Sequence, residues 1–131
     1  MAMINDRALT APTPNPETEV FFEAAEDGTL LIGRCLTTGK AFFFPRALSP
    51  FTLTDNVEWV EASGRGTIYT FSHMARAPEP FVIAYVELEE GPKMLTNIVD
   101  CDAETLKIGM AVNLVFKPSE DGPPIPMFTP A

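Results

Sequence analysis

Few side chains in this 131-residue sequence have the types and spacing that catalysis needs. His73 is the single histidine, and no serine or cysteine has a recognisable base and orienting group in its sequence context, so a nucleophilic triad is unsupported. The acidic residues Glu87, Glu89 and Glu90 have the pattern of a solvated hairpin rim rather than of a paired general acid and base. The sequence therefore predicts no catalytic residues.

The two cysteines, Cys35 and Cys101, are expected to be free thiols. The first ten residues contain charges and no apolar segment, so we expect no secretory signal and a cytoplasmic location, where thiols stay reduced. No apolar run reaches the roughly 18 residues that a membrane-spanning helix needs, and no membrane partner is expected.

The prolines separate the chain into terminal arms and a body. Eight of the 13 prolines lie in the two terminal segments. Because proline fixes φ and removes a backbone donor, these segments are expected to be extended and to stay out of helices and central strands. The sequence predicts an extended arm over residues 1–15 and a proline-rich tail.

A short helix and a knuckle are expected within residues 16–54. Asn15 and Pro16 have the types found at the first residues of a helix, and Gly28 is a typical stop. Two apolar runs follow, Leu30–Ile32 and Ala41–Phe44, and they predict a small hairpin or knuckle.

The remainder, residues 55–131, has the pattern of strands. Residues 58–74 resemble one long strand that Gly64 and Gly66 bend, and Asp102 caps one helical turn. The other expected strands are Phe81–Val86, Lys93–Val99, Val112–Phe116 and Ile125–Phe128. This set indicates a mainly β fold, a five-stranded Greek-key barrel of the OB type, after an N-terminal helix and a small knuckle.

Several strings, in order along nearly the whole chain, resemble the family called domain of unknown function 35. They are Phe21–Ala25, Gly28–Cys35, Phe44–Arg46, Trp59–Tyr69, Val86–Pro92, Ile108–Met110 and Pro126–Phe128. The resemblance implies a helix, a rubredoxin-like zinc ribbon and an OB-fold domain. It also implies a role as an accessory subunit of acyl-CoA enzymes, namely thiolases, aldolases and MaoC-like hydratases.

The chain departs from this family at the four positions that match zinc ligands. These positions are Cys35, Thr38, Ser49 and Thr52, so one thiol stands with three hydroxyls. Because a structural zinc site needs four thiolate or imidazole ligands, we expect a degenerate, metal-free ribbon and no cofactor.

Phe42, Phe43, Phe44 and Phe51 allow two interpretations. They could form a small core between the helix and the knuckle. Adjacent residues of a strand face opposite sides, however, so at least one of the three consecutive phenylalanines should face outward. We therefore assign these four residues to a partner interface, since exposed aromatic side chains mark interfaces.

Charge restricts the ligands of the barrel. Eighteen acidic and nine basic side chains give a net charge of −9, most of it within residues 55–131. A barrel that binds single-stranded nucleic acid needs a positive groove, so nucleic acid is rejected as the primary ligand. Arg65 and Arg76 are assigned to a ligand phosphate. Because the mean field repels phosphates, a partner enzyme is expected to supply the CoA phosphate site.

The sequence thus predicts a non-catalytic OB-fold accessory subunit of an acyl-CoA-metabolising thiolase, aldolase or hydratase. It would assist assembly of the complex or border acyl-CoA at a shared interface, and a homo-oligomer is a further option. The alternative is a stand-alone OB-fold module that binds single-stranded nucleic acid or a small ligand. A free-standing hydratase or thioesterase lacks visible catalytic residues.

Overall fold

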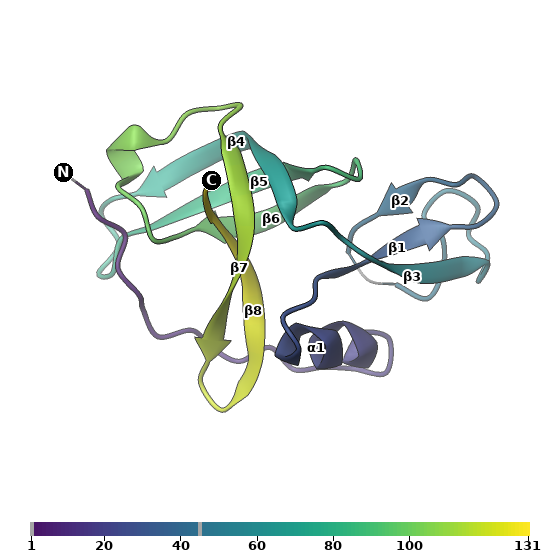
Figure 1. The fold of residues 1–131 in the computed structure, drawn as a ribbon. Coiled ribbons are helices and arrows are strands. Elements are labelled where there is room, and N and C mark those ends of the chain that lie inside the picture. The colour runs from purple at the N-terminus through teal and green to yellow at the C-terminus, as the bar shows by residue number, and fades with distance from the viewer. Residues whose placement is uncertain (1, 45) are drawn as a thin grey trace.

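The computed structural model describes residues 2–44 and 46–131. It contains two sheets: a three-stranded sheet in the order β2-β1-β3, and a closed barrel in the order β4-β5-β6-β8-β7 (Figure 1). The elements are α1 (Glu19–Glu26), β1 (Leu31–Cys35), β2 (Ala41–Phe42), β3 (Val57–Glu61), β4 (Arg65–Met74), β5 (Phe81–Leu88), β6 (Lys93–Ile98), the 3-10 turn η1 (Ala103–Thr105), β7 (Ala111–Ser119) and β8 (Gly122–Pro130). The predicted mainly β fold with a five-stranded OB barrel and an N-terminal helix is confirmed.

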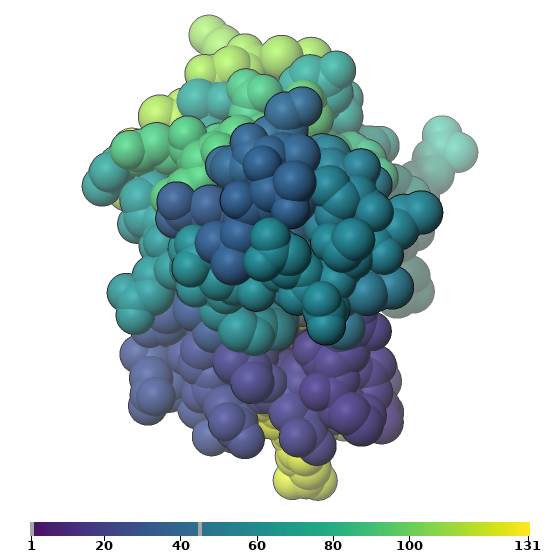
Figure 2. All heavy atoms as spheres, turned by 90° about the vertical axis from the view of Figure 1, so that its right-hand side faces the viewer, coloured from purple at the N-terminus to yellow at the C-terminus, as the bar shows by residue number. Residues whose placement is uncertain are grey.

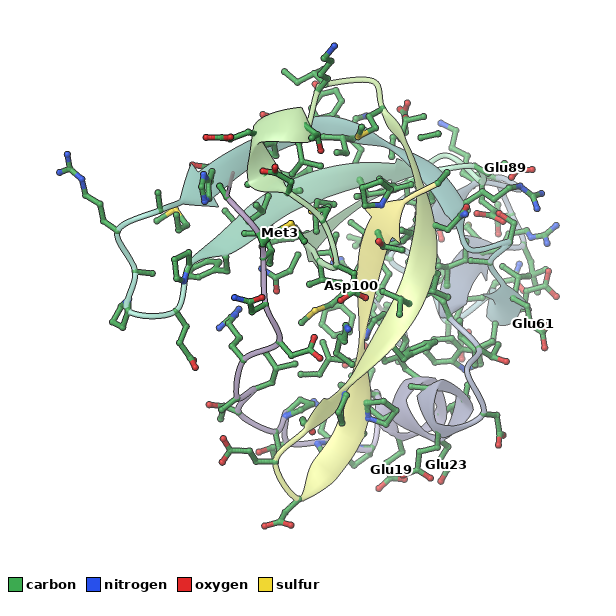
Figure 3. The ribbon with its side chains drawn as sticks, turned by 60° about the vertical axis from the view of Figure 1, so that its left-hand side comes forward. Met3, Glu19, Glu23, Glu61, Glu89 and Asp100 are labelled. Atoms are coloured by element: carbon green, nitrogen blue, oxygen red, sulfur yellow. The ribbon has the colours of Figure 1, made fainter. Side chains whose placement is uncertain are left out.

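The helix begins three residues later than the sequence suggests. The Asn15 side chain accepts hydrogen bonds from the backbone N–H groups of Glu17 and Thr18, at 2.9 and 3.0 Å, and so closes a turn ahead of α1. Phe21 and Ala25 form the buried side of the helix. Glu19 and Glu23 point away from the barrel (Figure 3).

The expectation of one long bent strand over residues 58–74 is wrong, because this segment forms two strands in different sheets. β3 pairs antiparallel with β1, from Leu31 opposite Glu61 to Cys35 opposite Val57. The break falls at Gly64, whose φ of 84° lies in the left-handed region that favours glycine. Residues 57–61 therefore belong to the three-stranded sheet of the knuckle. We call this sheet and its loops the ribbon. The domain boundaries given above stay a prediction.

Both terminal segments contact the barrel instead of leaving it. In the N-terminal arm, the backbone N–H of Ile4 donates to the carbonyl of Cys101 at 2.8 Å, and the Ile4 side chain is buried. Lys117 on β7 forms ion pairs with Asp6 and Asp100, both at 2.9 Å. Figure 3 shows Met3 and Asp100 where the arm passes along the barrel.

The proline-rich tail is barrel strand β8, which contains the predicted strand Ile125–Phe128 and is longer than it. Its place between β6 and β7 corrects the expectation that prolines keep this segment out of central strands. β8 pairs with β7 from Gly122 to Pro130, but with β6 only where Ile98 lies opposite Phe128. Proline is tolerated because one side of β8 makes so few ladder hydrogen bonds. Phe128 fills the barrel interior and is fully buried.

None of the helices in the described parts of the chain is long and apolar enough to cross a membrane.

Candidate functional site

A groove of about 530 Å³ lies where α1 and the ribbon meet the barrel. Most of its lining is apolar, and the lining comes from five parts of the chain. It comprises Thr10 and Pro12 of the arm, Phe21 and Phe22 of α1, Phe43, Phe44 and Arg46 after β2, Tyr85, Lys93, Met94, Leu95, Thr96 and Asn97 of β5 and β6, and Ile125 and Pro126 of β8. A ligand or a partner segment in this groove would contact both parts of the protein.

One wall of the groove is a stack of phenylalanine rings. Phe43 and Phe44 stack with their centroids 5.0 Å apart, and Phe21 contacts them at 6.0 and 5.7 Å. Phe22 meets Phe21 edge to face at 5.1 Å. Packed aromatic rings give a firm apolar surface, suited to an apolar chain or to a partner side chain.

The opposite wall is the outer face of β5 and β6. Tyr85 lies opposite Leu95, and the two side chains are 45% and 51% exposed. Ile83, next along the same face, is also exposed. These three side chains form an exposed apolar part of the sheet face, which is typical of a binding surface.

Two cations lie at the groove, and they differ in their partners. Lys93 pairs with Glu87 at 3.5 Å, and its Nζ lies 4.8 Å from the centre of the Tyr69 ring. Arg46 forms no salt bridge with any residue in the described ranges. Arg46 is therefore the cation in this groove that is free to meet a ligand anion or a carboxylate of a partner.

Arg65 and Arg76, which the sequence analysis assigns to a ligand phosphate, lie outside this groove. The Nε and Nη2 of Arg65 donate to the two carboxylate oxygens of Glu89 at 2.5 and 3.0 Å. This contact raises the pKa of Arg65 and lowers the pKa of Glu89. Glu89 also accepts from the Ser63 hydroxyl at 3.1 Å, so Arg65 is engaged where the ribbon joins the barrel. Arg76 lies in the turn after β4.

The predicted interface phenylalanines have different surroundings. Phe42 is buried and packs over Gly33, whereas Phe43 is half-buried. Phe44 and Phe51 are both 45% exposed. Phe42 is therefore a core residue, whereas Phe44 and Phe51 are exposed. The assignment of the four phenylalanines to a partner interface stays a prediction.

The four positions of the zinc ligands gather at the knuckle of the ribbon. Cys35 is buried, and hydrogen bonds from Ser49 and Thr38 lower the pKa of its thiol to about 6. Ser49 also accepts from the backbone N–H groups of Phe51 and Thr52, at 3.1 and 3.3 Å. The knuckle is held by hydrogen bonds between hydroxyls, backbone and thiol.

Sequence reasoning did not single out Arg46 or Lys93. Nothing in the sequence distinguishes these two basic residues from the other lysines and arginines, because only the tertiary fold brings them to one groove. The other residues considered for chemistry lie apart from it: Cys101 is buried beneath the N-terminal arm, where burial raises the pKa of its thiol. His73 lies on β4, opposite Val82.

Comparison with known proteins defines the class of this chain. Residues 22–48 match the family model described as "ChsH2, rubredoxin-like zinc ribbon domain". Residues 59–117 match the model described as "ChsH2, C-terminal OB-fold domain". The chain is a zinc ribbon and OB-fold protein of this type.

Similar proteins place the chain in a family. It is 41% identical over 101 residues to a "DUF35 domain-containing scaffold protein" of Methanocaldococcus jannaschii; the matched region is 70% of this chain and 72% of that protein. It is 31% identical over 125 residues to a "Probable enoyl-CoA hydratase alpha subunit" of Thermomonospora curvata; the matched region is 92% of this chain but 39% of that subunit. The chain belongs to the DUF35 family, as the sequence resemblance predicts.

A solved structure agrees in fold and in family. A chain of the "Ltp2-ChsH2(DUF35) aldolase" superposes with a TM-score of 0.81 at 31% identity, over 91% of this chain and 98% of that one. The names of these proteins are those of scaffolds and subunits of enzymes, in keeping with the accessory role that the sequence predicts.

The expectation of a metal-free ribbon without a cofactor is contradicted by the match of residues 22–48 to a zinc ribbon domain, which supports zinc binding. Within residues 2–44 and 46–131, however, no group of three or more His, Cys, Asp or Glu side chains could hold a metal ion. Cys35 offers a thiol, and Thr38, Ser49 and Thr52 offer hydroxyls, which zinc binds poorly. The donor set of this chain does not fit the tetrahedral site of its domain class.

Proposed function

We propose that this chain is a non-catalytic accessory subunit of an acyl-CoA-metabolising enzyme of the thiolase, aldolase or hydratase type. The observation that carries the proposal is the groove between the ribbon and the barrel. Its Phe43–Phe44 stack and its Tyr85–Leu95 wall are apolar, and Arg46 stands among them as a free cation. The names of the relatives support the same role.

The groove suits the acyl or pantetheine part of acyl-CoA better than its phosphates. An apolar chain gains from contact with the aromatic rings, whereas the phosphates meet a protein of net charge −9. Arg65 is held by Glu89 and is not free to offset that charge. The partner enzyme would therefore supply the phosphate site, and this chain would complete the acyl site at the shared interface.

The chain supplies no catalytic residue in this proposal. His73 and Cys101 lie outside the groove, and the glutamates of the β5–β6 turn are engaged with Ser63 and Arg65. The partner would carry out the chemistry, as expected for a subunit that positions substrate and stabilises a complex. A cytoplasmic location accords with this role.

Purification of the tagged full chain from its own host tests this proposal. We expect a thiolase, aldolase or hydratase subunit to copurify in stoichiometric amount, as identified by mass spectrometry. Purification of the chain without any acyl-CoA enzyme would overturn the proposal.

A matched pair of variants tests the groove. Leu95→Glu places a charge on the groove wall, and Ile108→Glu places the same charge at an exposed side chain of the same size outside the groove. We expect Leu95→Glu to weaken acyl-CoA binding by the purified complex about tenfold, and Ile108→Glu to leave it unchanged. Equal binding by both variants would show that the groove does not hold the acyl part.

A further inference from the structure

The inner end of the groove lies at the boundary between β6 and β8. Both faces of β6 line it: Leu95 points out of the barrel, whereas the side chains of Met94 and Thr96 are only 2% and 8% exposed and face the interior. Ile125 and Pro126 of β8 complete this end. We call Met94, Thr96, Ile125 and Pro126 the seam. Because interior side chains line the groove here, the groove passes around the edge of β6 and reaches the barrel core.

A proline of β8 explains why the barrel ladder is interrupted at the seam. β8 bonds to β7 through alternate residues, among them Ala131 to the carbonyl of Ala111, and this series leaves Pro126 and Phe128 facing β6. Phe128 bridges Ile98 there. Pro126 has no N–H to donate, so the pairing with β6 stops after this one bridge.

A side-chain hydrogen bond holds the seam in place of the ladder. The Thr96 hydroxyl donates to the carbonyl of Pro126 at 3.2 Å, and both residues are buried. Because this bond satisfies the hydroxyl, the seam presents Met94, Ile125 and the proline ring, which are all apolar. A saturated chain gains from such contacts, whereas the amides of pantetheine would lose their bonds to water there.

Exposure falls from the mouth of the groove to the seam. Phe44, Tyr85 and Leu95 on the outer walls are about half exposed, whereas Met94 is buried. Figure 2 faces the ribbon side of the molecule, where the ribbon and α1 lie in front of the barrel. A ligand whose CoA end stays in the partner enzyme would reach the seam with its opposite end, which is the end of its acyl chain.

Met94 forms the floor of the seam. Its side chain belongs to the apolar core of the barrel, and it lies opposite Val86 in the β5–β6 pair. Methionine is unbranched and adapts to irregular neighbours, so it suits a floor that a chain end contacts. We propose that the seam holds the end of the acyl chain and that Met94 limits the chain length that the groove accepts. This inference rests on the proposed function and adds to it the residue that selects the acyl group.

A series of S-alkyl-CoA thioethers, from butyl to dodecyl, tests the inference, because the partner enzyme cannot cleave a thioether as it would a thioester. Calorimetry measures their affinity for the complex of the full chain with the copurified enzyme subunit. Met94→Ala removes Cγ, Sδ and Cε from the floor, and Met94→Val shortens the side chain by less. Met127→Ala is the control, since Met127 is 3% exposed and lies outside the groove, beside the N-terminal arm.

In the unmodified complex, the affinity should rise about fourfold with each methylene until the chain meets Met94, and then level off. In Met94→Ala the rise should continue for about two further methylenes, so that the longest chains bind about tenfold more tightly than in the unmodified complex. Met94→Val should give a smaller extension, and it carries the same test should Met94→Ala not fold. Met127→Ala should level off at the same length as the unmodified complex, although it loses a buried side chain of the same size.

Three results would overturn the inference and leave the proposed function standing. The first is an affinity that does not depend on chain length, which would place the acyl chain outside the seam. The second is the same levelling length in both Met94 variants as in the unmodified complex, and the third is an equal extension in Met127→Ala. If no acyl-CoA enzyme copurifies with the unmodified chain, the proposed function fails and this inference fails with it.

Discussion

Gly33 on β1 leaves the space that the Phe42 ring fills, and its replacement by alanine would test how the ribbon is packed. The two residues lie directly opposite each other in the β1–β2 pair. A Cβ atom on residue 33 would lie 2.3 Å from Cζ and 2.4 Å from Cε2 of Phe42. The ring cannot move freely, because it is buried and packs edge to face against Phe51, at 6.4 Å between centroids.

The size of the effect follows from these distances. Packed carbon atoms lie about 3.5–4.0 Å apart, so the ring must shift by about 1 Å or more. Overpacking of this kind costs about 1–3 kcal/mol, and alanine in place of glycine within a strand recovers about 0.5–1 kcal/mol. We expect Gly33→Ala to lower the free energy of unfolding by about 1–2 kcal/mol, with a fall in melting temperature of about 3–6 °C.

A double-mutant cycle measured by urea denaturation separates this clash from other effects. Leucine at position 42 lacks the ring atoms that the new Cβ would meet, so Gly33→Ala should cost little or nothing in the Phe42→Leu background. The reasoning is refuted if Gly33→Ala is equally destabilising in both backgrounds, or if it stabilises the unmodified chain.

Three further predictions concern the barrel and the arm. Phe128→Ala, at a fully buried ring, should lower the free energy of unfolding by about 3–5 kcal/mol in urea denaturation. Ile4→Ala should loosen the N-terminal arm and speed the reaction of the buried Cys101 with a thiol reagent, because it removes the buried side chain that anchors the arm where the Ile4 N–H donates to the Cys101 carbonyl. Hydrogen bonds from the N–H groups of Ala2 and Glu104 lower the pKa of Asp102 from its ordinary value of 3.8. The stability that Asp102 contributes should therefore be present above that value and be lost as the pH falls through the lower pKa of the folded state. Asp102→Asn should remove it.

Each of these expectations has a contrary result. A loss below about 1 kcal/mol for Phe128→Ala would mean that β8 does not close the barrel core. Unchanged labelling of Cys101 in Ile4→Ala would mean that the arm does not cover it. A stability difference between Asp102→Asn and the unmodified chain that grows toward acid pH would reverse the sign expected for a lowered pKa.

The barrel was predictable from the sequence because its strands alternate and are bounded by glycine and proline. β7 shows the alternation in its sequence, at Val112, Leu114 and Phe116, whereas β5 is apolar on both faces and alternates only in burial. The barrel class and the family could both be predicted, because several sequence strings typical of the family occur in order along the chain. The single helical turn was also predictable, because Asp102 accepts the hydrogen bond expected of a cap.

Strand partners were less accessible. The alternation in residues 58–63 is the same whether that strand continues into the barrel or pairs with the ribbon, because pairing is a tertiary choice. The strand β8 was underestimated for a related reason. Its prolines disfavour an ordinary central strand, and only the sparse pairing with β6 makes their position acceptable.

The candidate site shows where local patterns stop being informative. Arg65 and Arg76 were chosen as the basic residues of the barrel, but Glu89 holds Arg65, and Arg46 of the ribbon reaches the groove instead. For zinc, the residue types and the domain class disagree. Three of the four ligand positions are hydroxyl side chains, which zinc binds poorly, whereas residues 22–48 match a zinc ribbon domain.

The central claim is that this chain completes an acyl-CoA site together with a partner enzyme. Calorimetry with one acyl-CoA, performed on the chain alone, on the partner alone and on their complex, tests that claim most directly. The account predicts that the complex binds acyl-CoA more tightly than either protein alone, and that the isolated chain binds it weakly. Submicromolar binding by the isolated chain, equal to that of the complex, would contradict it.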